Sequence, residues 1–209
     1  MMTKPRGTDG ASLLPPSGLS SQSLPILEFQ LSTPFYRVHS SGYGPIFYGP
    51  GSGRDPTYRF DPLSRSFGVL YIAPKPSAAI IETILRNPQR RIVDYDTVKS
   101  KSLSVLTCDE TVRLVNATGA NLSAMGTTAA LFTGPYDPCG AWSDALHDHP
   151  ESPNGILFPS RHNPAELCIA LFDRDGFDLI VEETTPLSDM HDVIGDLLDQ
   201  HGKSLAGYP

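Results

Sequence analysis

Short runs of apolar residues dominate the hydrophobic pattern of the chain and predict β-strands. The clearest run, "SFGVLYIAP" (66–74), is apolar on both faces and therefore predicts a central strand. Similar runs predict further strands at 34–39 ("PFYRVH"), 91–94, 103–106, 112–116, 155–160 ("GILFPS") and 166–173 ("ELCIALFD").

Three other stretches predict helices. "KPSAAIIETILRNP" (75–88) has Pro76 in its first turn and ends at Asn87-Pro88, as helices commonly do. "DPCGAWSDALHDHP" (137–150) ends at a proline, and "LSDMHDVIGDLLDQHG" (187–202) repeats its apolar residues at helical spacing. Because strands and helices alternate irregularly, the pattern predicts an α+β fold rather than regular βαβ winding.

Two stretches lack any such pattern. Residues 1–30 are rich in Ser, Pro and Gly, so we expect a flexible or surface-draped N-terminal arm before a single domain at 31–209. The Gly- and Pro-rich stretch 40–56 predicts a long loop that is functional or mobile. Its "GPGSG" segment lacks the Lys-Ser/Thr ending of a phosphate-binding loop, so a flexible lid or spacer is the simpler interpretation.

Composition narrows the class of protein. Among the 209 residues, 39% are hydrophobic and 19% charged, which is typical of a soluble globular domain. The net charge of −7 and the absence of a basic run argue against nucleic-acid binding. The sequence shows neither a bilayer-length apolar run nor an export signal, so we expect no membrane association. Three widely spaced cysteines do not form a disulfide framework, which favours a reducing, cytoplasmic compartment.

A metal site is not expected. His147, Asp148 and His149 lie near Cys139, but their spacing matches no standard zinc pattern. Histidines at the end of a helix are also explained by the favourable interaction of cations with that end.

Several polar residues lie where an apolar pattern would not place them. Arg37 and His39 share one face of the strand at 34–39. Glu82 lies on the same helical stripe as Ala78, Ile81 and Leu85, so it is paired, protonated or functional. An ion pair with Arg86 one turn along is an equally good interpretation.

Tyr71, Ser160 and Arg59 each allow a structural and a functional interpretation. Tyr71 is within a strand, where a core tyrosine is the commoner outcome. Ser160 ends a strand, where serine usually supports a turn, and Arg59 lies among aromatic residues in "YRFDP". Together, the arginines could bind phosphates, and a buried carboxylate could stabilise a developing positive charge.

These residues resemble the RES-domain family, named for an arginine, a glutamate and a serine. The matching stretches are "FYRVH", "YRFDP", "FGVLYIAPKPSAAIIETIL", "GILFPSRH" and "CIALFD", in the family's order from Phe35 to Asp173. Arg37, Glu82 and Ser160 fall on the naming residues. Arg59 and Tyr71 fall on the second arginine and the strand tyrosine. Asp61 stands where relatives often have an asparagine.

The resemblance implies a split β-sheet with peripheral helices, like that of ADP-ribosyltransferases, around a cleft that binds NAD⁺ as substrate. Arg37 and Arg59 would bind the pyrophosphate, and Tyr71 would stack on nicotinamide or its ribose. Glu82 would stabilise the oxocarbenium-like transition state, and Ser160 would hold the nicotinamide ribose or amide. His39, Arg161 and His162 are candidates for binding an acceptor phosphate.

The implied activity is cleavage of the nicotinamide–ribose bond, with transfer of ADP-ribose to inorganic phosphate or water and no metal. A protein mono-ADP-ribosyltransferase and a non-catalytic NAD-binding module are the alternatives. Many relatives are toxins held inactive by an antitoxin with an Xre-type DNA-binding domain, so we expect such a partner. Whether the chain forms a homodimer is left open.

Overall fold

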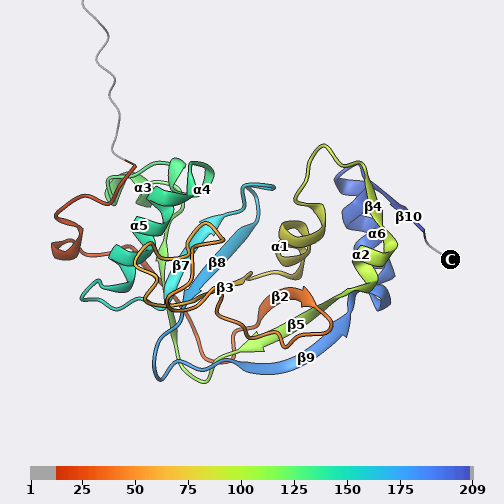
Figure 1. The fold of residues 1–209 in the computed structure, drawn as a ribbon, viewed down its shortest axis with the longest axis horizontal. Helices are drawn as coiled ribbons and strands as arrows, with labels where there is room; N and C mark the ends of the chain where they lie inside the picture. Colours follow the sequence, from red (N-terminus) through yellow and green to blue (C-terminus); the bar gives the residue numbers. More distant parts are fainter. Residues whose placement is uncertain (1–12, 208–209) are drawn as a thin grey trace, which may run out of the picture.

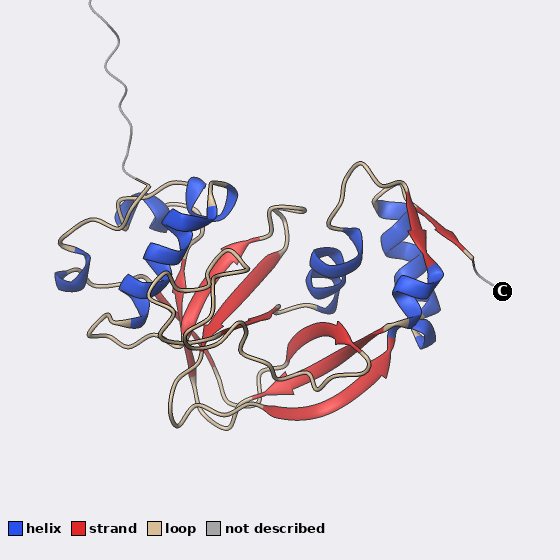
Figure 2. Cartoon of the chain, in the orientation of Figure 1, coloured by secondary structure: helices blue, strands red, loops and turns tan. Residues whose placement is uncertain are grey.

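The computed structural model describes residues 13–207, which form two main β-sheets with helices around them (Figure 2). The larger sheet has five strands in the order β1-β6-β7-β8-β3. They are β1 (Ile26–Phe29), β6 (Val112–Asn116), β7 (Gly155–Pro159), β8 (Leu167–Phe172) and β3 (Val69–Ile72). Only β6 and β7 pair in parallel within this sheet.

The second sheet has three antiparallel strands in the order β2-β5-β9 (Figure 1). They are β2 (Phe35–Ser40), β5 (Lys101–Thr107) and β9 (Ile180–Pro186). Tyr36 in β2 exchanges two backbone hydrogen bonds with Ala73, just after β3, at 2.8 and 2.9 Å. This bridge joins the edges of the two sheets, so the predicted α+β fold with a split sheet is confirmed.

Helices cover both ends of the molecule (Figure 1). The predicted helix at 75–88 forms α1 (Pro76–Ile80) and a π-helical turn, η2 (Ile81–Leu85), and the other two predicted helices are α5 (Tyr136–His147) and α6 (His191–Gln200). The remaining short elements are η1 (Leu19–Ser21), α2 (Tyr95–Lys99), α3 (Asn121–Ala124), α4 (Ala130–Thr133), η3 (Leu187–Asp189), and the parallel pair β4 (Ile92–Asp94) and β10 (Ser204–Ala206). Among the described residues, no helix is long and apolar enough to pass through a lipid bilayer.

Three clusters of buried side chains hold these layers together. One lies between the five-stranded sheet and α5 and includes Trp142 and Phe172. A second joins α1, η2, α2 and α6, with Ile80 and Leu198 among its members. A third, which includes Phe35, fills the region where the two sheets meet. The strand β2 contributes to both neighbouring clusters because its alternate side chains point to opposite faces.

The N-terminal segment differs from the predicted arm at 1–30. Residues 26–29 form β1 and pair with β6 in register, so they belong to the sheet. Leu19 and Leu24 are 3% and 7% exposed and complete the first core cluster. The boundary predicted at residue 30 is therefore too late, because two isolated leucines in a polar stretch bury more surface than its composition indicates. Residues 1–12 lie outside the described part of the chain.

The predicted loop at 40–56 packs closely on the larger sheet. Gly49 and Val69 form a β-bridge, and the carbonyl oxygen of Tyr48 would lie 2.5 Å from a Cβ placed on Gly68. A side chain at position 68 would therefore displace the loop. The loop carries exposed aromatic residues, Tyr43 and Phe47.

Candidate active site

A hydrogen bond joins two of the predicted site residues across the fold. Ser160 follows β7, and its hydroxyl donates to Oε1 of Glu82 in the π-helical turn η2. The flanking residues Ile81 and Leu85 are buried, whereas the Glu82 side chain is 32% exposed. Glu82 is thus a carboxylate held at the edge of an apolar helix. π-Helical turns are frequent at functional sites.

The Ser160 hydroxyl has no capacity left for a ligand. The residue is fully buried, and its Oγ accepts hydrogen bonds from the backbone N–H groups of His162 and Asn163, both at 3.1 Å. With one proton donated and two accepted, the hydroxyl is saturated. This geometry favours positioning of Glu82 over the direct contact with the nicotinamide ribose or amide that the resemblance implied.

His162 is the second neighbour of the Glu82 carboxylate. Its Nε2 lies 3.8 Å from Oε2 of Glu82, whereas no ion pair between Glu82 and Arg86 forms among residues 13–207. Burial lowers the pKa of His162; the negative charge of Glu82 opposes this shift, and nearby arginines, Arg161, Arg86 and Arg59, add to it. The imidazole beside Glu82 is therefore neutral near pH 7.

Cys168 completes the surroundings of Glu82. Burial and the adjacent Glu82 carboxylate raise the pKa of this thiol. Cys168 is 6% exposed and lies in the first core cluster. A protonated, buried thiol is unreactive, so it lines the back of the carboxylate without serving as a nucleophile.

Arg59 is a buried cation with unused hydrogen-bonding capacity. The residue is 8% exposed. One terminal nitrogen, Nη1, donates to the carbonyl of Gly134 at 2.6 Å, and the guanidinium lies 4.7 Å from the ring centroid of Tyr136. The other terminal nitrogen, Nη2, is buried and has no partner among the described residues. Such a donor is costly to leave unpaired, so it is suited to a ligand oxygen.

Tyr71 and Asp61 fix the turn that carries Arg59. The Asp61 carboxylate accepts from the backbone N–H groups of Thr57 and Tyr58 at 2.8 and 2.6 Å. The Tyr71 hydroxyl donates to Asp61 at 3.2 Å and accepts from the N–H of Phe60 at 2.8 Å. Burial and the Asp61 charge raise the pKa of Tyr71. Only the ring of Tyr71 is therefore left for a ligand, because its hydroxyl is engaged.

Arg37 lies under the loop at 40–56. Its Nη1 donates to the carbonyl of Pro45. Burial lowers the pKa of Arg37, and the phenols of Tyr58 and Tyr48 oppose this shift. Tyr58 packs edge-to-face on Tyr71, with centroids 5.6 Å apart. Arg37 is therefore connected to the Tyr71 group through electrostatics and neighbouring rings and not through a direct hydrogen bond.

The other two predicted residues differ in their surroundings. His39 is 9% exposed, and its ring nitrogens lie 2.9 Å from Ser104 Oγ and 3.1 Å from the carbonyl of Ser40. Arg161 is exposed beside Ser160. His39 is thus bound within the three-stranded sheet, whereas the Arg161 side chain is exposed at the surface.

Sequence reasoning missed a second link between the strand end and the helix. Oε1 of Glu166 accepts from the Ser77 hydroxyl at 2.8 Å, and its backbone carbonyl accepts from the N–H of Ser160 at 2.8 Å. Glu166 therefore fastens the segment that follows β7 to the first turn of α1. The signal was a carboxylate directly before the apolar run of β8.

The histidines near Cys139 have structural contacts. His147 stacks on Phe67 with centroids 3.9 Å apart. The His149 ring bonds to the carbonyl of Leu19 and the N–H of Glu151, both at 3.1 Å. Within residues 13–207, no group of three His, Cys, Asp or Glu side chains is arranged to hold a metal ion.

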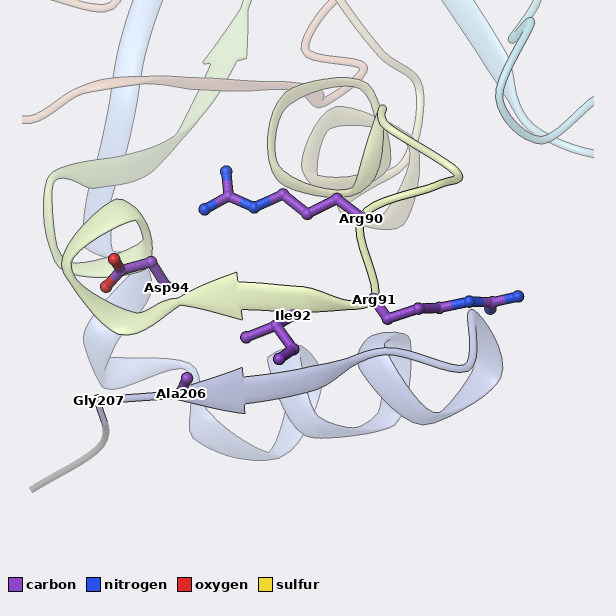
Figure 3. A pocket seen from close by; sticks show the side chains of 6 residues that line it. All are labelled: Arg90, Arg91, Ile92, Asp94, Ala206 and Gly207. Carbon is purple, nitrogen blue, oxygen red and sulfur yellow. The ribbon is translucent and has the colours of Figure 1, made fainter.

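Elsewhere, a shallow cavity of ≈ 420 Å³ lies on the outer face of the β4–β10 pair (Figure 3). Ile92 and Asp94 of β4, the preceding Arg90 and Arg91, and the end of β10 line it. It contains none of the predicted site residues, so it is separate from the group around Glu82.

A comparison with models of protein families identifies the family of this chain. A family model described as "RES domain" matches residues 34–190, about three quarters of the chain. The chain therefore belongs to the RES-domain family, as the sequence predicted.

The chain is also similar to a curated relative and to a solved structure. Over 58 residues the chain is 45% identical to "Probable toxin y4kH" of Sinorhizobium fredii (strain NBRC 101917 / NGR234), a stretch that spans 28% of this chain and 45% of that relative. The chain thus matches less than half of the relative's length. The structure of the M. tuberculosis MbcT-MbcA toxin-antitoxin complex matches with a TM-score of 0.58 and 15% identity, over 88% of this chain and 100% of the matched chain. At this identity the match shows a shared fold.

Proposed function

We propose that this chain is an NAD⁺-degrading enzyme that cleaves the bond between nicotinamide and ribose. The observation that carries the proposal is the Glu82 carboxylate, which is partly exposed and fixed by the buried hydroxyl of Ser160. An anion held rigidly in a largely apolar setting is the group that stabilises a developing positive charge most effectively. Membership of the RES-domain family is consistent with this chemistry.

The cations nearby suit the pyrophosphate of NAD⁺. Arg59 has a buried nitrogen, Nη2, without an acceptor among the described residues, and Arg37 has a guanidinium that burial deprives of water. Each could donate charge-assisted hydrogen bonds to a phosphate oxygen. The ring of Tyr71, next to that of Tyr58, would provide an apolar surface for nicotinamide or its ribose.

The proposed reaction needs no acid for the leaving group. When the bond from ribose C1′ to the pyridinium nitrogen breaks, its electron pair stays on nicotinamide, which leaves as a neutral molecule. The sugar becomes oxocarbenium-like, and Glu82 stabilises its positive charge. An acceptor oxygen then bonds to C1′ and loses its proton, for which the neutral His162, beside Glu82, would serve as the base. Arg161 would attract inorganic phosphate if phosphate is the acceptor.

The test is nicotinamide release from NAD⁺, followed by chromatography with and without inorganic phosphate. Glu82→Gln keeps the size of the side chain but removes its charge, and should reduce the rate by about 10²–10³-fold. Glu110→Gln changes an exposed carboxylate on another part of the chain and should leave the rate unchanged. Equal rates for the wild type and Glu82→Gln would disprove the role assigned to Glu82.

Other results of the same assay identify the alternatives. Transfer of label from NAD⁺ to a protein would indicate a mono-ADP-ribosyltransferase. Retention of NAD⁺ without turnover would indicate a binding module.

We also propose that the chain is a toxin controlled by an antitoxin protein with an Xre-type domain. The support is the name of the relative, a probable toxin, and the fold shared with a structure solved as a toxin-antitoxin complex. Expression of the wild-type chain should arrest growth, whereas Glu82→Gln should not. Co-expression of a helix-turn-helix protein encoded next to it should restore growth.

A further inference from the structure

An apolar hollow lies between α2 and α6. These two helices are at the end of the molecule opposite α3 and α4 (Figure 1). Its volume is ≈ 280 Å³. It shares no residue with the group around Glu82, so it is independent of the proposed function. The side chains around it are mostly aliphatic: Tyr95, Val98, Leu187, His191, Ile194, Gly195, Leu198 and Leu205.

The hollow exists partly because α6 has a glycine in its middle. A Cβ on Gly195 would meet no other atom of residues 13–207 within 4 Å, and the backbone there does not have a left-handed conformation. Neither crowding by the described residues nor backbone geometry requires this glycine. Glycine inside a helix lowers the stability of the helix. Its presence is explained if another molecule approaches α6 closely at this point.

An acidic stripe runs along α6 beside the hollow. Asp192, Asp196 and Asp199 follow each other at i, i+4 and i+7, and all three are exposed. No cationic side chain among residues 13–207 forms an ion pair with them. Like charges at this spacing repel each other, and Asp199 in the last turn also opposes the helix dipole. Asp189 and Asp96 extend the exposed negative charge to η3 and α2.

We propose that this surface, the α2–α6 hollow and its acidic stripe, docks a basic segment of a partner protein that inserts one apolar side chain beside Gly195. Asp192 is in the first turn, where the helix dipole favours a negative charge, but the glycine, the repulsion among the aspartates and Asp199 in the last turn each reduce the stability of α6 in isolation. These features become favourable against such a segment. Because this surface is negatively charged, charge complementarity favours a positively charged partner segment. The hollow accommodates a single aliphatic or aromatic anchor, the kind of residue that dominates binding energy at interfaces.

The probe is a synthetic amphipathic helix built from leucine and lysine, with a control peptide in which glutamate replaces every lysine. Each peptide is titrated into the full-length ¹⁵N-labelled chain, and amide shifts are followed. Gly195→Leu fills the hollow and raises helix propensity, so it should fold. Val193→Leu adds a methylene on the exposed, opposite side of α6 and serves as its control.

We expect saturable shifts confined to α2 and α6 with the lysine peptide. Gly195→Leu should weaken binding about tenfold or more, while Val193→Leu binds normally. The Asp192→Asn/Asp196→Asn double variant should weaken binding and reduce its salt dependence. The matched Asp173→Asn/Asp175→Asn variant, at a distant turn, should not. Nicotinamide release should be equal in all variants, which separates this test from that of the proposed function.

Three results would overturn the proposal. One is the absence of saturable binding, and another is equal binding by the two peptides or by Gly195→Leu and the wild type. The third is concentration-dependent self-association of the chain that Gly195→Leu abolishes, because the hollow would then accommodate a second copy of this chain.

Discussion

The Glu82 carboxylate has neighbours with three different kinds of polar group. The Ser160 hydroxyl donates to Oε1, the His162 ring lies beside Oε2, and the Cys168 thiol lies close enough for the carboxylate to raise its pKa. Ser160 is fully buried, whereas His162 and Glu82 are partly exposed. The buried side of the carboxylate is therefore fixed, and its other side can meet a ligand.

Removal of the Ser160 hydroxyl should affect both stability and turnover. Ser160→Ala leaves two backbone N–H groups and Glu82 without a hydrogen-bond partner, so we expect a loss of about 1–3 kcal/mol in the free energy of unfolding. Because the hydroxyl positions Glu82, kcat for nicotinamide release should fall while KM for NAD⁺ changes little. Denaturant unfolding and steady-state kinetics measure these effects, with Ser123→Ala, at an exposed site, as the control. A change confined to KM would instead indicate direct substrate contact.

The lowered pKa of His162 predicts a response to acid. Burial lowers this pKa, and Arg161, Arg86 and Arg59 add to the shift, so that together they outweigh the opposing charge of Glu82. The unfolded chain, with a histidine pKa of about 6.5, therefore binds the proton more readily than the folded chain does. The stability that His162 contributes is fully present above about pH 6.5, the pKa of histidine in the unfolded chain. It is lost as the pH falls through the lower pKa of His162 in the folded chain.

The measurement is the unfolding temperature from pH 8 to pH 5, beside the pH dependence of kcat/KM for nicotinamide release. His162→Gln cannot be protonated, so the decline of its unfolding temperature on the acid side should be smaller than that of the wild type. The acid limb of kcat/KM should also lose the contribution of this group. Identical pH dependence in the two proteins would show that His162 does not titrate in this range.

Individual residues of the site could be predicted from the sequence, but the contacts between them could not. Glu82 and Arg37 were conspicuous because they interrupt apolar patterns whose period is known. The saturation of the Ser160 hydroxyl by two neighbouring amides depends on the turn after β7, which composition does not specify. The position of Glu82 beside His162 instead of Arg86 likewise depends on how η2 meets that turn.

Two elements position the residues of the site. One is the helix formed by α1 and η2, and the other is the turn after β7. Glu82 comes from η2, and Ser160 and His162 come from the turn. The Ser77–Glu166 hydrogen bond holds the two pieces together from the other end of the helix. A shift of one piece would separate the hydroxyl from the carboxylate without changing either residue.

Loss of this link should therefore reduce catalysis at a distance. Ser77→Ala removes the hydrogen bond to Glu166, so we expect about 1 kcal/mol of destabilisation and a severalfold lower kcat, with KM for NAD⁺ nearly unchanged. Ser77→Thr retains the hydroxyl and should restore kcat. Kinetics of both variants test this role; a purely structural link would lower the unfolding temperature of Ser77→Ala and leave kcat as in the wild type.

The elements that the sequence predicted were those buried on at least one side. The runs at 66–74, 155–160 and 166–173 became strands of the larger sheet, because continuous apolar runs indicate burial on both faces. The strand β9 has a nearly fully exposed sequence, "IVEETTP", and was missed because it lacks a buried face. The strands β1 and β10 are short and pair with distant partners, which local patterns do not reveal.

At the scale of the whole molecule, the N-terminal segment closes one side of the larger core. The carbonyl of Leu13 accepts a hydrogen bond from the indole N–H of buried Trp142 at 2.9 Å, and the N–H of Leu24 donates to Glu151 at 3.0 Å. Between these contacts, Leu19 lies in the cluster around Trp142. This segment is far from Glu82 in the sequence and contributes none of the contacts described for that carboxylate.

Leu19→Ala should therefore lower the free energy of unfolding without lowering the rate of nicotinamide release. Truncation of a leucine that is 3% exposed leaves a cavity in the first core cluster, and should cost about 2–5 kcal/mol in the free energy of unfolding. Leu31→Ala, at a site that is 57% exposed, should cost less than about 0.5 kcal/mol. Denaturant unfolding measures both. Well below its unfolding temperature, Leu19→Ala should release nicotinamide at the wild-type rate, because the contacts around Glu82 do not involve this cluster's N-terminal side. A stability equal to that of Leu31→Ala would mean that the N-terminal segment lies on the surface without completing the core.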